Sequence, residues 1–296
     1  VMDASQNIGF FYNGRIPTRE NPKAARKVVQ GISSSAIWPL NRPIEKLPTF
    51  INPPNGWIQS TNQNPYAVMW KHSMALDPKS PNVYFEQRLT NRSFVANELL
   101  STPIKITLDD FIDIKFDHSY SENSRQFKYL MKLAKNNPEI AEKVRPWDRQ
   151  TNFKNKHAGY NSCLMAHEWL SEMNAQPIPT TEDVLSKCQN WFAEINREQT
   201  DEWEKITTIT RLGRSYPIQG SVDTLRAVYG TPNAETNSID MSGGDGLFYI
   251  IEESLDGRMI YGMHNFGSSR NSESVHYSDQ TFLFSKEALR FIPDNL

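Results

Sequence analysis

The sequence predicts an α+β fold, because three stretches with different residue patterns follow one another along the chain. Residues 1–83 combine a short aromatic segment with a long proline-rich stretch, residues 84–213 carry helical spacing, and residues 214–296 return to extended runs. Strands that precede and follow a block of helices are typical of α+β layered proteins, whereas parallel α/β sheets alternate strand and helix. We therefore expect sheet at both ends of the sequence and helices in the middle.

The first expected strand lies in the segment NIGFFYNGRIPTR, residues 7–19. Aromatic and branched residues favour a strand, and Asn13-Gly14 is a strong turn dipeptide, so we expect a strand and a turn near a hairpin. Residues 34–66 then contain prolines, which have no amide hydrogen to donate to a ladder, at positions 39, 43, 48, 53, 54 and 65. A long irregular stretch of this kind is usually functional or disordered.

Apolar residues at three-and-four spacing predict a series of helices in the middle of the chain. Val95 and Leu99 lie four residues apart in the first, and Thr107 is the expected N-cap of the second, with Asp110 three residues later. Further helices are predicted, with prolines between them, at residues 124–134, 138–145, 160–173 and 181–198.

The end of the chain predicts a β-hairpin. The runs GLFYIIEES and RMIYGMHNF are separated by LDG, which places Asp256-Gly257 at the turn. The preceding GGDG, residues 243–246, lacks the lysine and the strand–loop–helix setting of a phosphate-binding loop, so we expect a turn into the next strand.

Composition excludes several classes of function. The chain has 296 residues, with 32 Lys and Arg against 34 Asp and Glu and a mean hydropathy of −0.61. Neither sign of charge forms a long block, so nucleic acid is not an expected partner. No apolar run approaches the roughly 18 residues that cross a bilayer, so no membrane span is expected. The pattern is that of a folded, water-soluble protein.

Metal and acid–base chemistry find weak support in the sequence. Cys163 and Cys188 are expected to form either a packed pair of thiols or a disulfide, and no histidine stands at a convincing ligand spacing from them. His167-Glu168 begins like a zinc-protease motif but lacks the second histidine. The acidic segment from Asp109 to His118 is interpreted mainly as helix capping, with a self-contained metal hydrolase as the alternative.

Several short tracts of the sequence occur in the same order in a known protein family. The loop NPPNGWIQSTNQNP, residues 52–65, has a shared pattern of amide, proline and Gly-aromatic positions, and a strand ending in G-x-x-P-x-R stands upstream of it. The tracts WDR, GRSYPIQGSVDTLRA and GGD follow, and GSSRNSESVHYSDQTFLF closes the chain. The positions that carry this similarity are Gly14, Pro17, Arg19, Asn52, Pro53, Gly56, Trp57, Asn62, Pro65, Gly267, Ser268, Ser269, His276, Tyr277, Asp279 and Gln280.

These tracts resemble the penicillin amidase family, which includes penicillin and acyl-homoserine lactone acylases. By this resemblance, residues 1–296 form the C-terminal portion of the catalytic β subunit. Residues 1–83 would supply a strand and the oxyanion loop, residues 84–213 a mainly helical segment, and residues 214–296 the returning strands and the C-terminal signature. The resemblance implies part of an Ntn-hydrolase αββα four-layer sandwich, produced by autoproteolytic processing of a precursor.

The nucleophile that the resemblance implies is the N-terminal serine of the catalytic subunit. Its own α-amino group, which titrates near neutral pH, takes the hydroxyl proton. This chain begins Val1-Met2, and Ser5 is internal. We therefore expect the nucleophile on another segment of the same processed precursor, so that the chain by itself is an incomplete enzyme and works in a heteromer.

The resemblance also implies roles for individual residues. Asn62 would donate its side-chain amide to the oxyanion, Arg92 would orient the groups around it, and Trp57 and Trp70 would line an acyl pocket unless they belong to the core. His276, with Tyr277 and Asp279, is interpreted as a structural network that holds the C-terminal tail. Some relatives bind calcium through acids near the active site, but none follows Asn62 at the expected place, so no cofactor or metal is expected.

The resemblance leads to a functional hypothesis and an alternative. The chain is expected to be part of an amide hydrolase that splits an acyl-homoserine lactone, a penicillin or a lipopeptide into an acyl acid and an amine, which links it to quorum quenching or antibiotic chemistry. The closing signature resembles the acyl-homoserine lactone branch most. The family implies a periplasmic or secreted location. The alternative is a non-catalytic binding or structural relic of the acylase scaffold.

Overall fold

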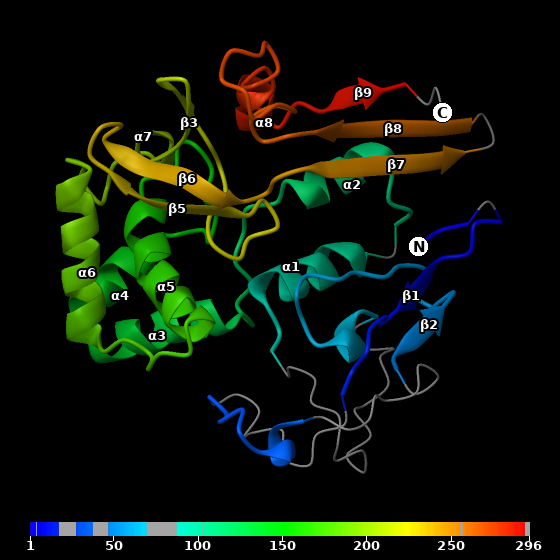
Figure 1. The fold of residues 1–296 in the computed structure, drawn as a ribbon. Helices are drawn as coiled ribbons and strands as arrows, with labels where there is room; N and C mark the ends of the chain where they lie inside the picture. Colours follow the sequence, from blue (N-terminus) through cyan, green and yellow to red (C-terminus); the bar gives the residue numbers. More distant parts are fainter. Residues whose placement is uncertain are drawn as a thin grey trace. The chain divides into compact units, whose positions relative to one another are not determined.

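The computed structural model describes residues 1–3, 5–17, 28–37, 47–69, 88–102, 104–254 and 257–293. The chain divides into two compact units, Val1–Ser93 and Phe94–Leu296. Short strands occupy the first unit, while the second contains helices followed by two sheets (Figure 1). The predicted α+β class is therefore confirmed.

The first unit is built around the antiparallel pair β1 (Gly9–Phe11) and β2 (Thr49–Ile51), in which Phe10 lies opposite Phe50. Asn52 fixes this pairing, because its side-chain oxygen accepts from the Ile8 amide at 3.0 Å and its own backbone N–H donates to the Ile8 carbonyl at 2.9 Å. Among the described residues the partner of β1 is thus distant in sequence. The expected strand is present, but within the described residues it does not pair across Asn13-Gly14, because the side chain of Asn52 and the stacking of the two rings favour β2.

The middle of the chain is helical, and the helices predicted from its local sequence are present. Helix α1 spans Asn91–Leu100, and α2 (Leu108–Lys115) begins with the predicted capping box, in which Thr107 and Asp110 exchange side-chain to backbone hydrogen bonds. Most of the acids at the start of α2 therefore serve its N-terminus. The four further helices agree with prediction to within a few residues, and they are α3 (Arg125–Asn136), α4 (Pro138–Val144), α5 (Ala158–Met173) and α6 (Thr181–Glu194).

Two sheets follow the helices in the second unit (Figure 1). After α7 (Trp203–Ile206), a four-stranded sheet has the order β4-β3-β6-β5, in which only the β3–β6 pair is parallel. The strands begin earlier than the expected boundary at residue 214. Their bounds are β3 (Thr207–Arg211), β4 (Arg214–Pro217), β5 (Val228–Asn233) and β6 (Ser238–Gly244).

The predicted C-terminal hairpin is also present. Strands β7 (Phe248–Ser254) and β8 (Gly257–Met263) pair antiparallel, and β9 (Arg290–Ile292) joins β8 after the short helix α8 (Thr281–Ser285). Gly257 has φ of +120°, a conformation that a side chain would strain, while Asp256 lies outside the described residues. The Asp-Gly dipeptide therefore predicted the turn because the glycine adopts a positive φ there.

The disulfide Cys163–Cys188 joins α5 to α6 inside the helical core. This settles the two alternatives left open by the sequence in favour of a covalent bridge. The core around it is formed mainly by α3, α4, α5 and α6, and α5 is buried from Ala158 to Glu168. A helix buried over most of its circumference explains why the sequence of α5 shows little amphipathic pattern.

A buried arginine connects the two sheets of the second unit with α8. Arg226 is 0% exposed, and its guanidinium donates to the Phe284 carbonyl at 2.7 Å and lies 3.2 Å from the carboxylate of Asp245. Glu287 lies 3.3 Å from its Nε atom, and the Phe284 ring lies 4.0 Å from its central carbon. Lys115 shares Asp245 at 2.7 Å, and burial lowers the pKa of this lysine. The tracts GRSYPIQGSVDTLRA and GGD therefore meet in one ionic cluster.

The closing signature packs onto β3 through a stacked arginine. The Arg211 guanidinium lies 3.7 Å from the centre of the Tyr277 ring and 4.6 Å from that of Phe266. His276 and Asp279 interact through Nδ1 and a carboxylate oxygen at 2.9 Å. Tyr277 therefore holds the tail against β3, and His276 and Asp279 contact each other within the tail, which agrees with the structural interpretation of these three residues.

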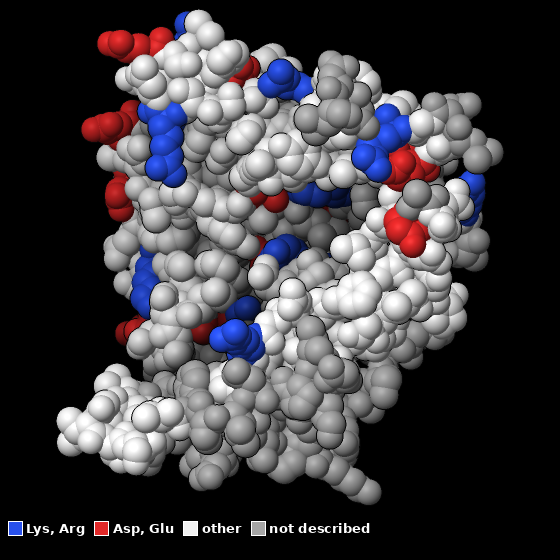
Figure 2. Space-filling model, turned by 45° about the vertical axis from the view of Figure 1, so that its right-hand side comes forward, with Lys and Arg blue, Asp and Glu red and all other residues white. Residues whose placement is uncertain are grey.

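None of the helices among the described residues is both long and apolar enough to cross a membrane. On the face shown in Figure 2, Lys and Arg side chains lie scattered among Asp and Glu side chains, and the described residues form no broad area of one sign.

We predict that Arg226→Ala lowers the free energy of unfolding by about 3–5 kcal/mol, because Glu287 loses its charged partner and Asp245 keeps only Lys115 in a largely buried cluster. Urea unfolding followed by tryptophan fluorescence measures this difference. Arg214→Ala is the matched control, since Arg214 is exposed on β4, and we expect a change within about 0.5 kcal/mol. An equal effect of the two substitutions would contradict the importance of the cluster.

Candidate functional site

The loop that carries Asn62 is shaped by prolines and by residues in the left-handed region of the backbone. Pro53 and Pro65 are buried, Gly56 has φ of +75°, and Asn62 itself has φ of +60°. Asparagine is among the few side chains that occupy this region readily. The sequence of the loop thus turns the backbone sharply at Asn62 and leaves its side chain exposed.

The structure places Arg92 directly against Asn62. Nη2 of Arg92, the second residue of α1, donates to Oδ1 of Asn62 at 3.1 Å. A guanidinium can only donate, so the amide oxygen must face it and the NH₂ group of Asn62 must point elsewhere. Among the described residues this NH₂ group has no acceptor. It is available as a donor to a group that approaches from outside.

Polar side chains on both sides of Asn62 join the loop to the start of α1. The Thr61 and Thr90 hydroxyl oxygens lie 3.1 Å apart, and Thr90 also donates to the Thr61 carbonyl at 3.1 Å. Gln63 folds back so that its side-chain oxygen accepts from the Thr61 amide at 2.7 Å and from the Thr61 hydroxyl. Asn64 then caps the 3-10 helix Pro65–Ala67.

Sequence reasoning did not identify Thr61, Gln63 or Thr90. A local signal existed for Thr90, because its hydroxyl accepts from the Ser93 amide at 3.1 Å, which is the N-cap arrangement of a helix that starts at Asn91. The pairing of Thr90 with Thr61 has no local signal, since 29 residues separate them. Residues 70–87, which connect the loop to α1, lie outside the described residues.

Of the two tryptophans expected to line an acyl pocket, the structure describes only Trp57. Trp57 is partly buried in the same loop and does not belong to the described core cluster of the first unit, which contains Phe50, Val68 and Met69. Trp70 lies outside the described residues. The role of either ring in binding an acyl chain remains a prediction.

The arrangement at Asn62 can stabilise negative charge on a carbonyl oxygen. An amide N–H that is held in place by its own oxygen loses little entropy when an oxyanion forms next to it. A family model for penicillin amidase matches residues 1–293, nearly the whole chain. The chain belongs to the penicillin amidase family. Amide hydrolysis by acylases is the general activity of penicillin amidases, and an oxyanion donor is the kind of group that such chemistry requires.

The alternative of a metal hydrolase is not supported by the described part of the chain. Asp110 belongs to the capping box, and Asp117 accepts from the backbone and hydroxyl of Ser119. The described residues contain one group of three potential ligands, formed by Cys163, His167 and Cys188 within 4.8 Å of one another.

The expectation that no histidine approaches the cysteines is therefore wrong, because His167 follows Cys163 by one helical turn on α5. Both sulfur atoms are bonded to each other, however, and a disulfide offers no thiolate to a metal. The group is not a metal centre in this oxidised form of the chain.

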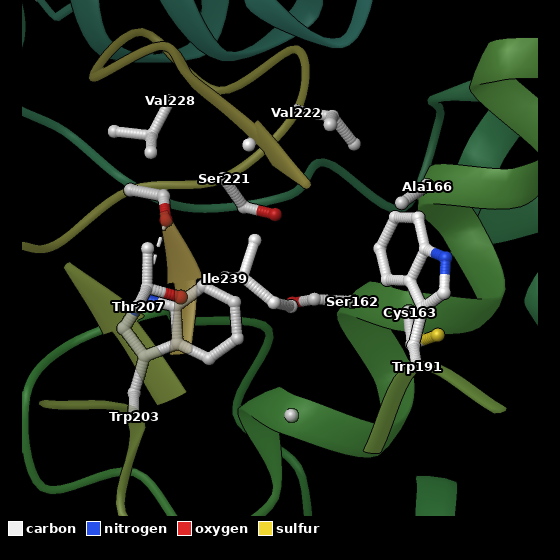
Figure 3. Close-up of a pocket in the computed structure, with 13 residues that line it drawn as sticks. Ser162, Cys163, Ala166, Trp191, Trp203, Thr207, Ser221, Val222, Val228 and Ile239 are labelled. Atoms are coloured by element: carbon white, nitrogen blue, oxygen red, sulfur yellow. Dashed lines mark hydrogen bonds between the residues drawn. The ribbon is translucent and has the colours of Figure 1, made fainter. Parts of the chain in front are cut away.

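A cavity of about 30 Å³ lies between α5, α7 and the four-stranded sheet (Figure 3). Its walls are mostly apolar, with the rings of Trp191 and Trp203 on opposite sides. The buried hydroxyls of Ser162 and Thr207 have no hydrogen-bond partner within the described part of the chain. A space of this size matches about one or two water molecules. It is too small for the acyl chain of a penicillin amidase substrate.

Two neighbouring residues of α5 have strongly shifted pKa values. Burial raises the pKa of Glu168 to about 7, although Arg125 lies 3.2 Å from its carboxylate and opposes the shift. Burial, with a smaller contribution from Lys187, lowers the pKa of His167 to about 4. The His167 ring packs against Trp191 at 4.4 Å. These shifts follow from placing ionisable groups in the core, and neither residue lies in the unit that contains Asn62.

We predict that the two shifts affect stability in opposite directions. The pKa of Glu168 is raised from 4.5, so this residue makes the free energy of unfolding fall as pH rises from about 4.5 to 7. The pKa of His167 is lowered from 6.5, so this residue makes the free energy of unfolding rise as pH rises from about 4 to 6.5. Each contribution amounts to at most about 3 kcal/mol. As pH rises through these ranges, the stability of Glu168→Gln should therefore increase relative to that of the wild type. The stability of His167→Phe should decrease relative to that of the wild type.

Urea unfolding of the wild type and both variants between pH 4.5 and 7.5 measures these differences. The comparison with the wild type removes the contributions of all other titrating groups. Curves for the variants that run parallel to the wild-type curve would contradict both pKa shifts.

Proposed function

We propose that this chain supplies the oxyanion-binding side of an acylase that uses an N-terminal serine. In this proposal Asn62 donates its side-chain N–H to the oxyanion, and Arg92 holds the amide in the required orientation. The observation that supports it most directly is the 3.1 Å hydrogen bond from Arg92 to the amide oxygen of Asn62. It leaves the NH₂ group of this exposed amide without an acceptor among the described residues.

The proposed reaction proceeds through an acyl-enzyme. The serine hydroxyl attacks the carbonyl carbon of the substrate amide while the serine's own α-amino group takes the hydroxyl proton. The oxyanion of the tetrahedral intermediate accepts a hydrogen bond from Asn62. When the intermediate collapses, the C–N bond breaks, the amine leaves with the proton, and water later hydrolyses the acyl ester to the acid. The nitrogen of Ser5 is part of a peptide bond, so the serine is proposed to come from another segment of the same processed precursor.

The proposal places the chain in a larger assembly. Residues 1–296 would be the C-terminal portion of the catalytic subunit, and the sheets and helices of the second unit would form part of a four-layer αββα sandwich that other segments complete. The α+β composition supports this assignment. Strand β7 is at the edge of its described sheet, with exposed Tyr249 and Ile251, which suits an element that is covered by a neighbouring segment.

The proposed substrate is a linear amide with an acyl chain, such as an acyl-homoserine lactone, a penicillin or a lipopeptide. Trp57 would contribute an aromatic wall next to the oxyanion site, because it lies in the same loop as Asn62. No cofactor takes part in the proposed steps. The disulfide Cys163–Cys188 supports a periplasmic or secreted location, since disulfides persist mainly in oxidising compartments.

We predict that Asn62→Ala in the mature enzyme lowers kcat about 100-fold to 1000-fold and leaves KM nearly unchanged, because the oxyanion donor acts on the transition state. Arg92→Lys should lower kcat by a smaller factor, since an ammonium cannot keep the planar hydrogen-bond geometry. Steady-state hydrolysis of an acyl amide measures both effects. Asn174→Ala, which removes an exposed amide at the end of α5, is the control and should keep wild-type kinetics.

The enzyme assignment itself is tested by intact mass and N-terminal sequencing of every polypeptide that co-purifies with the chain, with an amide-hydrolysis assay on the same sample. We expect a partner that begins with serine, and acylase activity. A folded sample without such a partner and without activity would instead favour a binding or structural relic of the scaffold.

A further inference from the structure

The hydroxyl pair Thr61 and Thr90 connects the two residues of the candidate site. Thr61 directly precedes Asn62, and Thr90 stands two positions before Arg92. We propose that these threonines, together with Gln63, form a clamp that positions Asn62 for catalysis. In the following paragraphs this set of three residues is called the threonine clamp. The inference rests on the proposed oxyanion role of Asn62.

The clamp fixes the start of α1 and the loop at the same time. The Thr90 hydroxyl accepts from the Ser93 amide at 3.1 Å and donates to the Thr61 carbonyl at 3.1 Å. The first bond caps the helix whose second residue is Arg92, and the second bond holds the residue before Asn62. One side chain therefore sets the distance between the Arg92 guanidinium and the Asn62 amide.

Gln63 closes the clamp on the other side of Asn62. Its side-chain oxygen accepts from the Thr61 amide at 2.7 Å, so a hydrogen bond joins the residues before and after Asn62. Asn62 lies between them with φ of +60°, a left-handed conformation that asparagine accepts and that these hydrogen bonds hold in place. The Thr61 hydroxyl also donates to Gln63 and lies 3.3 Å from the side-chain oxygen of Gln59.

Burial makes these bonds effective. Thr90 is only 4% exposed and Gln59 only 8%, so water competes little for their hydrogen bonds. Asn62, by contrast, is exposed. The network therefore forms a rigid polar base beneath an accessible donor, which is the arrangement that an oxyanion donor needs, since reorientation during the reaction would reduce its effect.

The clamp should affect the rate of the chemical step and have little effect on binding of the ground state. We expect Thr90→Val and Thr61→Val in the mature enzyme to lower kcat roughly tenfold or more, with KM within about twofold of the wild type. Thr90→Ser keeps the hydroxyl and should restore most of the rate. Gln63→Met, which removes the acceptor of the Thr61 amide and keeps a similar side-chain length, should lower kcat in the same selective way even if a valine variant folds poorly.

A double-mutant cycle separates positioning from general damage. If Thr90 acts only through Asn62, Thr90→Val should have no further effect on kcat in the Asn62→Ala background. Thr180→Val is the control, because the exposed Thr180 caps α6 through the same kind of hydrogen bond and belongs to the second unit, whereas Asn62 and Arg92 belong to the first. It should lower thermal stability through the lost cap and leave kcat unchanged.

The outcomes distinguish the clamp from the proposed function. An Asn62→Ala variant with the same kcat as the wild type would overturn the oxyanion role. A large effect of Asn62→Ala, combined with unchanged kcat in the Thr90→Val, Thr61→Val and Gln63→Met variants, would overturn the clamp alone. Equal losses from Thr90→Val in the presence and absence of Asn62 would also overturn it, because the threonine would then act on folding and not through the amide.

Discussion

The burial of the Arg226 guanidinium is the constraint on which most of the second unit depends. A charge that is removed from water must be matched by acceptors with good geometry, because an unpaired buried charge costs several kcal/mol. The acceptors come from Asp245, from Glu287 and from the Phe284 carbonyl of α8. These groups lie on segments that are far apart in sequence, so the cluster ties the start of β5, the turn into β7 and α8 to one another.

This requirement gives a physical meaning to tracts that looked like scattered family markers. Gly220 and Gly244 leave room for the Arg226 and Ala227 carbonyls, since a side chain at either position would lie 2.1 or 2.2 Å from those backbone oxygens. Asp223 accepts from the buried Gln126 of α3 at 2.7 Å, which joins the same tract to the helices. The family pattern in this region is therefore best understood as the support of one ionic cluster, whereas the chemistry is proposed to lie elsewhere.

The candidate site in the first unit uses neutral groups where the second unit uses charges. Hydroxyls and amides of the threonine clamp bond to one another, and only Arg92 carries a charge. This difference suits the two tasks. An ionic cluster stabilises a fold when it is closed on all sides, while an oxyanion donor must stay accessible and uncommitted until the substrate carbonyl becomes negative. Family membership and this open amide together support the acylase assignment.

The sequence by itself determined the features that depend on neighbours within a few residues. The capping box at Thr107, the helices α3 to α6 and the turn at Gly257 follow from local spacing, side-chain caps and backbone restrictions, and the family was recognised by the resemblance of short tracts. Only the tertiary structure decided that β1 pairs with β2, that Cys163 bonds to Cys188, and that Thr61 meets Thr90 beside Asn62 and Arg92. These contacts join residues 25 or more positions apart, and they depend on the path of the chain, which local patterns do not specify.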